Sequence, residues 1–76
     1  MDGKTSLLNL KTGQTAKISF ISGGKEVIKR LSDLGLTPGT KVKILIKAIF
    51  GGPIEIEVRG SKLFLGRGLI SKIFVD

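Results

Sequence analysis

The residues Arg30-Leu31-Ser32-Asp33-Leu34-Gly35-Leu36-Thr37-Pro38-Gly39-Thr40-Lys41-Val42 predict a helix end, a tight turn and the start of a strand. Leu31 and Leu34 are three residues apart and so share one helical face. Gly35 predicts the helix end, because glycine enters the left-handed backbone conformation without a Cβ penalty. Pro38-Gly39 matches the central positions of a type II turn. The residues expected to have structural roles are Leu31, Leu34, Gly35, Pro38 and Gly39.

On the N-terminal side of this stretch, residues 25–34 have helical periodicity. Their apolar side chains are spaced as one stripe along a helix, formed by Val27, Ile28, Leu31 and Leu34. The remaining face is charged or polar. We therefore predict one helix of about three turns that ends at Gly35 and covers one open end of a β-structure.

The rest of the chain alternates between apolar and polar residues in short runs, which indicates strands. We expect five of them, near residues 15–20, 41–48, 54–58, 62–65 and 72–75. Gly66-Arg67-Gly68 predicts a bend between the last two, with a short 3₁₀ turn near Leu69-Ile70. Within the first strand the alternation places Phe20 in the core. Closure of such strands removes exposed edges. The prediction is a mainly β protein, a small SH3-like barrel capped by one helix.

Strand register follows from matching apolar faces across each hairpin. A loop over residues 51–53 would pair Ala48 with Ile56 and Lys47 with Glu57. A type II′ turn at Gly60-Ser61 would pair Val58 with Leu63 and Ile56 with Leu65.

Length and composition restrict the class of protein. The 76 residues allow one domain, 1–76, and the absence of cysteine excludes disulfides. No apolar run is long enough to span a bilayer, and the N-terminus does not resemble a secretory signal. A cytoplasmic protein is the expectation.

Catalytic chemistry has little support in the composition. The chain has no histidine or cysteine, so a nucleophilic hydroxyl lacks its usual base and a His- or Cys-ligated metal site is excluded. Glu55 and Glu57 share an exposed strand face and are weak candidates for metal ligands, because two carboxylates supply too few oxygens. We predict no enzyme, no catalytic residue, no small-molecule substrate and no cofactor.

The net charge of +7 raises the alternative of nucleic-acid binding. Lys17, Lys41, Lys43 and Lys47 could form a basic stripe. Single-strand binders usually add exposed aromatic platforms, and this chain has four phenylalanines and no tyrosine or tryptophan. The scarcity of aromatic residues counts against nucleic-acid binding, and the alternative is a module that binds a protein partner; on the residues alone both functions remain open.

Two sets of residues are candidates for a partner surface. The first lies beside the Pro38-Gly39 turn and is expected to be exposed: Arg30, Leu36, Thr37 and Lys41. The second, Leu45 and Ile49, interrupts the alternation by pointing outward. Self-association as a homodimer, or cover by another part of the chain, explains this second set equally well.

The motif Leu31-x-x-Leu34-Gly35-Leu36-x-Pro38-Gly39-x-x-Val42 resembles the signature of the FeoA family of ferrous iron transport accessory proteins. The segment Leu10-Lys11-Thr12-Gly13-Gln14 and the closing Ile73-Phe74-Val75 are also similar to that family. The resemblance extends over residues 7–75.

This resemblance implies an SH3-like protein that assists Fe²⁺ uptake by contact with FeoB, a membrane permease with a cytosolic GTP-binding domain. It also implies a position at the inner membrane surface, reached through that partner. A related barrel occurs in iron-dependent repressors, so a metal-responsive regulatory module remains a further alternative.

Overall fold

The computed structural model describes residues 5–76 and shows short strands, two helices and two 3₁₀ turns in this part of the chain. In chain order the elements are β1 (Thr5–Ser6), η1 (Leu7–Asn9), β2 (Thr15–Ile21), α1 (Lys25–Asp33), β3 (Lys41–Lys47), η2 (Ile49–Gly51), β4 (Ile54–Val58), β5 (Ser61–Leu65), α2 (Arg67–Ile70) and β6 (Ile73–Val75).

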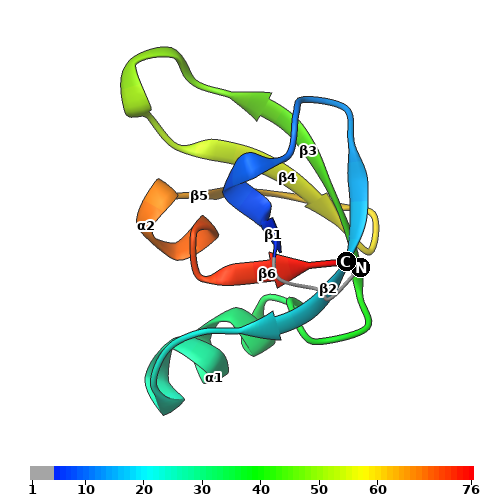
Figure 1. Cartoon of the computed structure of the whole chain (residues 1–76), viewed down its shortest axis with the longest axis vertical. Helices are drawn as coiled ribbons and strands as arrows, with labels where there is room; N and C mark the ends of the chain where they lie inside the picture. Colours follow the sequence, from blue (N-terminus) through cyan, green and yellow to red (C-terminus); the bar gives the residue numbers. More distant parts are fainter. Residues whose placement is uncertain (1–4) are drawn as a thin grey trace.

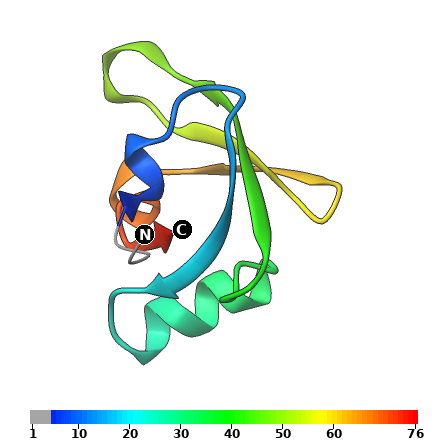
Figure 2. The same cartoon turned by 45° about the vertical axis from the view of Figure 1, so that its right-hand side comes forward.

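All strands belong to one antiparallel sheet in the order β1-β6-β2-β3-β4-β5. The sheet curls around a single core, with α1 across one open end (Figures 1 and 2). The η1 turn, which follows the edge strand β1, contacts α2, which follows the other edge strand β5. The mainly β architecture and its five predicted strands are confirmed. The two-residue β1 was not expected, and α2 replaces the predicted 3₁₀ turn at Leu69-Ile70.

The end of α1 has the geometry that its sequence predicts. Gly35 has a φ of +87°, and its amide donates to the Ser32 carbonyl at 2.9 Å. The Leu36 amide donates to the Leu31 carbonyl at 2.9 Å. These two bonds define a Schellman motif, in which the residue after the glycine also packs against the last helical turn. The motif directs Leu36 inward, next to Leu31.

The following turn joins α1 to the sheet. The Thr40 amide donates to the Thr37 carbonyl at 3.1 Å, and Gly39 has a φ of +92°. Both features fit the predicted turn, which needs positive φ at its second central residue. Gly39 N–H also donates to the Ile18 carbonyl at 2.8 Å, so the turn is fixed against β2.

The predicted β3–β4 register is wrong because the connection covers residues 48–53, so that Lys47 faces Ile54 and not Glu57, and because β3 also contains a bulge. Ile44 faces Ile56, but Ile46 faces Glu55, so Leu45 is an extra residue. A bulge reverses the faces of the residues after it. Ile46 therefore points outward, whereas half-buried Lys47 faces Ile54 and donates to the Leu8 carbonyl at 2.7 Å.

The predicted β4–β5 register is also wrong, because the turn lies one residue earlier than expected. Arg59 and Gly60 have φ values of +52° and +81°, which fits a type I′ turn at these two residues. Val58 consequently faces Ser61, and the apolar pairs are Ile56–Leu63 and Ile54–Leu65. The sequence favoured the next pair of residues because a type II′ turn needs glycine only at its first position.

A second bulge changes the position of Phe20, which was expected in the core. The β2–β6 register shifts between Ile18 and Phe20, so Ser19 is the extra residue. Phe20 is 42% exposed and stacks on Phe74, with ring centroids 4.8 Å apart and planes parallel to within 1°. The two rings thus form an external aromatic pair.

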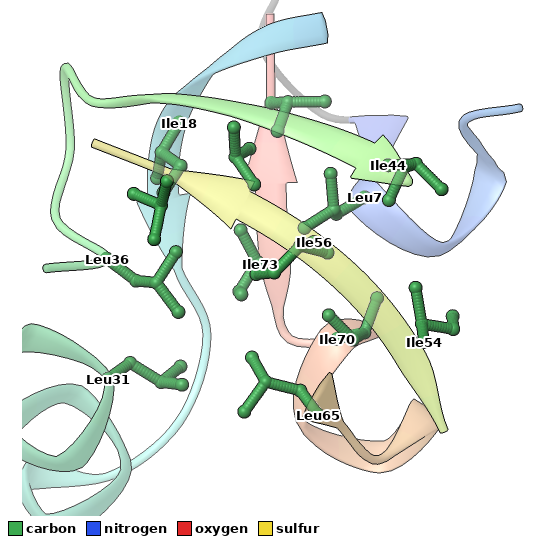
Figure 3. Close-up of a cluster of buried hydrophobic side chains, with 13 residues drawn as sticks. Leu7, Ile18, Leu31, Leu36, Ile44, Ile54, Ile56, Leu65, Ile70 and Ile73 are labelled. Atoms are coloured by element: carbon green, nitrogen blue, oxygen red, sulfur yellow. The ribbon is translucent and has the colours of Figure 1, made fainter. Parts of the chain in front are cut away.

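Every strand except the short β1, and both helices, contribute side chains to the core (Figure 3). Its buried side chains are Leu7, Ile18, Leu31, Leu36, Val42, Ile44, Ile54, Ile56, Val58, Leu65, Ile70, Ile73 and Val75. Of the predicted helical stripe, only Leu31 is fully buried, whereas Ile28 and Leu34 remain partly exposed.

Candidate functional site

The outer face of β3, β4 and β5 carries two kinds of surface. Nearer the Pro38-Gly39 turn, a cross-strand row contains Lys43, Glu57 and Lys62. Beyond the Leu45 bulge, the next row contains Ile46, Glu55 and Phe64. The face is therefore basic at one end and apolar at the other.

The basic end contains an open groove of about 520 Å³ between the Pro38-Gly39 turn and the β4–β5 turn. We call it the basic groove; its lining residues are Thr37, Pro38, Gly39, Thr40, Lys41 and Arg59. A neighbouring depression shares Lys41 and Arg59 and adds Thr15, Lys43 and Glu57. Because two residues line both, the hollowed surface is continuous.

Arg59 joins three elements at the basic groove. Its Nη2 donates to Thr40 Oγ1 at 3.2 Å, and Thr40 Oγ1 lies 3.0 Å from Thr37 Oγ1. The Arg59 Cδ lies 3.5 Å from the position that a Cβ on Gly35 would take. The guanidinium is thus held over the C-terminus of α1, where a cation is electrostatically favoured.

The apolar end forms a second candidate surface around the β3–β4 connection. We call it the apolar patch, formed by Ile46, Ile49, Phe50 and Phe64, which are 58%, 78%, 100% and 68% exposed. Isolated exposed apolar residues are ordinary, but these four lie in one connection and on the strands that adjoin it, which makes the region a candidate contact surface.

The backbone beneath the apolar patch is braced by α2. Arg67 Nε donates to the Gly52 carbonyl at 3.1 Å, and its Nη2 donates to the Ala48 carbonyl at 2.9 Å. Phe50 has φ and ψ of 63° and 32°, a left-handed conformation that costs a residue with a Cβ about 1–2 kcal/mol. The connection therefore holds Phe50 in a strained position facing solvent, which is a feature typical of functional loops.

The structure separates the predicted partner residues. Thr37 and Lys41 line the basic groove, whereas Arg30 is exposed on α1 and is not among the lining residues. The expectation that Leu36 is exposed is wrong, because the Schellman motif places its side chain in the core.

The second set of predicted partner residues, Leu45 and Ile49, is also separated in the structure. Ile49 belongs to the apolar patch. Leu45 was expected to point outward, but it is the half-buried bulge residue, and Ile46 takes the exposed position.

The two weak metal candidates face lysine and apolar residues across the sheet. Glu57 faces Lys43 and Lys62, and Glu55 faces Ile46 and Phe64. Among residues 5–76, no three acidic, histidine or cysteine side chains are grouped as a metal site.

Sequence reasoning missed Arg59 in the basic groove and Phe50 in the apolar patch. Gly60 carried a signal for the first, since a glycine at the second turn position fits a type I′ turn that begins at Arg59. The left-handed conformation of Phe50 had no signal, because a positive φ is rare for an aromatic residue.

Comparison with known proteins supplies the family. The model of the FeoA domain matches residues 5–76. The chain belongs to the FeoA family. A relative from Methanocaldococcus jannaschii named "Putative Fe(2+) transport protein A" is 33% identical over 66 residues, which cover 87% of this chain and 78% of that protein.

Solved structures support the FeoA fold. The FeoA-like protein of Clostridium acetobutylicum superposes with a TM-score of 0.89 at 28% identity, covering all of this chain and 88% of the other. Stenotrophomonas maltophilia FeoA, solved with zinc and described as a prokaryotic SH3 domain protein, gives 0.79 at 22% identity, covering 92% and 87%. The predicted SH3-like fold is therefore confirmed.

No helix in residues 5–76 of this FeoA-family chain is long and apolar enough to cross a bilayer.

Proposed function

We propose that this FeoA-family chain is a cytoplasmic accessory protein of ferrous iron uptake, and that it acts by contact with a FeoB-type GTP-binding permease. Membership of the family and the similarity to an Fe²⁺ transport protein A support the general role. Contact with the permease is the molecular mechanism that we infer for it.

The observation that carries this mechanism is the apolar patch. It combines a fully exposed Phe50 with Ile49 beside it in the connection and with Ile46 and Phe64 on the adjoining strands. Interfaces concentrate their binding free energy in a few aromatic and aliphatic anchors. Arg67 holds the connection in place, which lowers the ordering cost when a partner binds.

Contact fits the composition of the chain better than iron carriage does. The chain has no histidine or cysteine, which are the usual protein ligands for borderline transition metals. The two weak carboxylate candidates face lysines and apolar residues rather than other acids. We therefore propose that the chain acts on the transporter and does not carry its iron.

The test is a pull-down of the tagged chain from its native membranes, with identification of the recovered proteins. We expect a GTP-binding permease with the unchanged chain and its loss with Ile49→Asp, because a charge in the apolar patch opposes burial. Ser22→Asp is the matched control, since it adds the same charge at an exposed position before α1. Recovery of nucleic acid without a permease, or equal recovery with both variants, contradicts the proposal.

A further inference from the structure

The basic groove has a pronounced excess of positive charge. Lys41, Lys43 and Arg59 border it or the adjoining depression, while among residues 5–76 the one ion pair is Lys29–Asp33 on α1. Glu57 is the single acidic residue that lines the hollow. Because no carboxylate within residues 5–76 forms an ion pair with these three cations, we take their charge to be available to an external anion.

The groove also offers directed hydrogen-bond donors. A guanidinium has five N–H donors in a planar fork, and the described contacts of Arg59 use Nη2 toward Thr40. The hydroxyl groups of Thr37 and Thr40 bond to each other at 3.0 Å beside it. Carboxylates suit such a fork, because two parallel N–H···O bonds can form.

We propose that the basic groove binds an acidic peptide segment, rich in Asp and Glu, of a partner protein. The inference rests on the proposed function in one respect, namely that the chain works through contact with another protein. It adds a second contact, chemically distinct from the apolar patch and at the other end of the same sheet face.

Nucleic acid fits this groove less well than an acidic peptide does. Single-strand recognition needs aromatic rings on which bases stack, and none of the lining residues is aromatic. All four phenylalanines lie elsewhere: Phe50 and Phe64 are in the apolar patch, and Phe20 and Phe74 stack between β2 and β6.

An anionic membrane surface fits less well for a geometric reason. Proteins that lie on bilayers insert apolar side chains between the lipid headgroups. The basic groove is concave and its lining is mainly Thr, Gly, Lys and Arg, whereas an extended peptide chain can enter a groove of this kind.

The experiment is a titration of the ¹⁵N-labelled chain with an acetylated, amidated octaglutamate peptide at low salt, followed by amide chemical shifts. We expect saturable shifts concentrated at Thr37, at Gly39-Thr40-Lys41 and at Arg59-Gly60. An octaglutamine peptide is the uncharged control and should leave these shifts unchanged. Shifts spread evenly over all lysines, or no saturable binding, would overturn the proposal.

Two charge-matched variants separate a groove from net charge alone. Lys41→Glu should weaken octaglutamate binding about two- to fivefold, as expected for the loss of one exposed charge contact. Lys25→Glu makes the same change at the other end of α1 and should weaken binding less than twofold. Equal weakening by both variants would overturn the assignment of peptide binding to the basic groove.

Two further arms identify competing occupants. The ligand in these arms is a short single-stranded DNA or a vesicle that contains anionic lipid. If either one binds residues 37–41 saturably and more tightly than octaglutamate does, the assignment to a peptide is overturned. Failure here is distinguishable from failure of the proposed function, because recovery of the permease is measured independently and depends on Ile49.

Discussion

The two halves of β3 belong to the same ladder with β4, yet they present opposite surfaces. Before the bulge, Lys41 and Lys43 project beside the basic groove. After it, Ile46 projects into the apolar patch, and Lys47 turns to the Leu8 carbonyl. A single inserted residue, Leu45, thus ends the basic stripe and begins the apolar surface. The position of a bulge can therefore divide one sheet face into two chemically different surfaces.

The halves also differ in what supports them. The basic groove is lined by the turn that directly follows the Schellman motif, and Leu36 of that motif is buried in the core. The apolar patch projects from a connection that α2 holds through backbone hydrogen bonds. Core packing and side-chain bracing should therefore respond differently to substitution.

The largest expected effect concerns the core under the basic groove. Leu36→Ala should lower the free energy of unfolding by about 2–5 kcal/mol, because it leaves a cavity at a fully buried site. Urea denaturation measures this. The matched change Ile49→Ala in the apolar patch should stay within about 0.5 kcal/mol. Similar losses for both would mean that the two regions are not supported differently.

The next effect concerns the bracing of the apolar patch. Arg67→Ala should cost about 1–3 kcal/mol, because it removes two charge-assisted bonds to the carbonyls of Ala48 and Gly52. In hydrogen-exchange measurements on the variant, amides in residues 48–52 should exchange with solvent faster than in the unchanged chain, and this increase should exceed any increase at the Pro38-Gly39 turn. Loss of protection at the turn instead would contradict the local bracing.

A smaller effect of opposite sign is expected at Phe50. Phe50→Gly should stabilise the fold by about 0.5–1 kcal/mol, since glycine relieves the left-handed strain and gives part of that gain back as chain entropy. Thermal unfolding provides the measurement, and Phe64→Gly, within regular β5, is the control that should destabilise. Permease recovery should fall with Phe50→Gly despite the higher stability.

The smallest effect is expected at the other left-handed residue, Arg59. Arg59→Gly relieves similar strain at φ +52° but removes the bond to Thr40 and the packing over Gly35. The two contributions should cancel to within about 0.5 kcal/mol. Octaglutamate binding should nevertheless weaken, which separates a binding role from a stabilising one.

The end of α1, the Pro38-Gly39 turn and the five main strands were predictable because each has a local signal. Gly35 and Gly39 adopt the positive φ values that their positions require, and alternation located the strands. The bulges had no such signal. Ile44, Leu45 and Ile46 are all apolar, so the sequence does not show which of them is the extra residue.

The candidate site was only partly predictable for the same reason. Thr37 and Lys41 were expected beside a recognisable turn, and both line the basic groove. Leu36 looked exposed because it follows the helix, but the Schellman motif carries a packing requirement beyond its glycine. Arg59 reaches the groove from a hairpin that is distant in sequence, and its arrival depends on the turn type.

The pairing of β1 with β6 has a consequence for how the domain can be joined to other chains. Thr5 lies opposite Val75, so both ends of the described chain leave from neighbouring strands (Figure 1). Adjacent ends favour insertion into a loop of a host protein and circular permutation. A short linker between the strands of Thr5 and Val75, with new ends opened in the exposed Lys11-Thr12-Gly13 turn, should therefore preserve the barrel, the basic groove and the apolar patch.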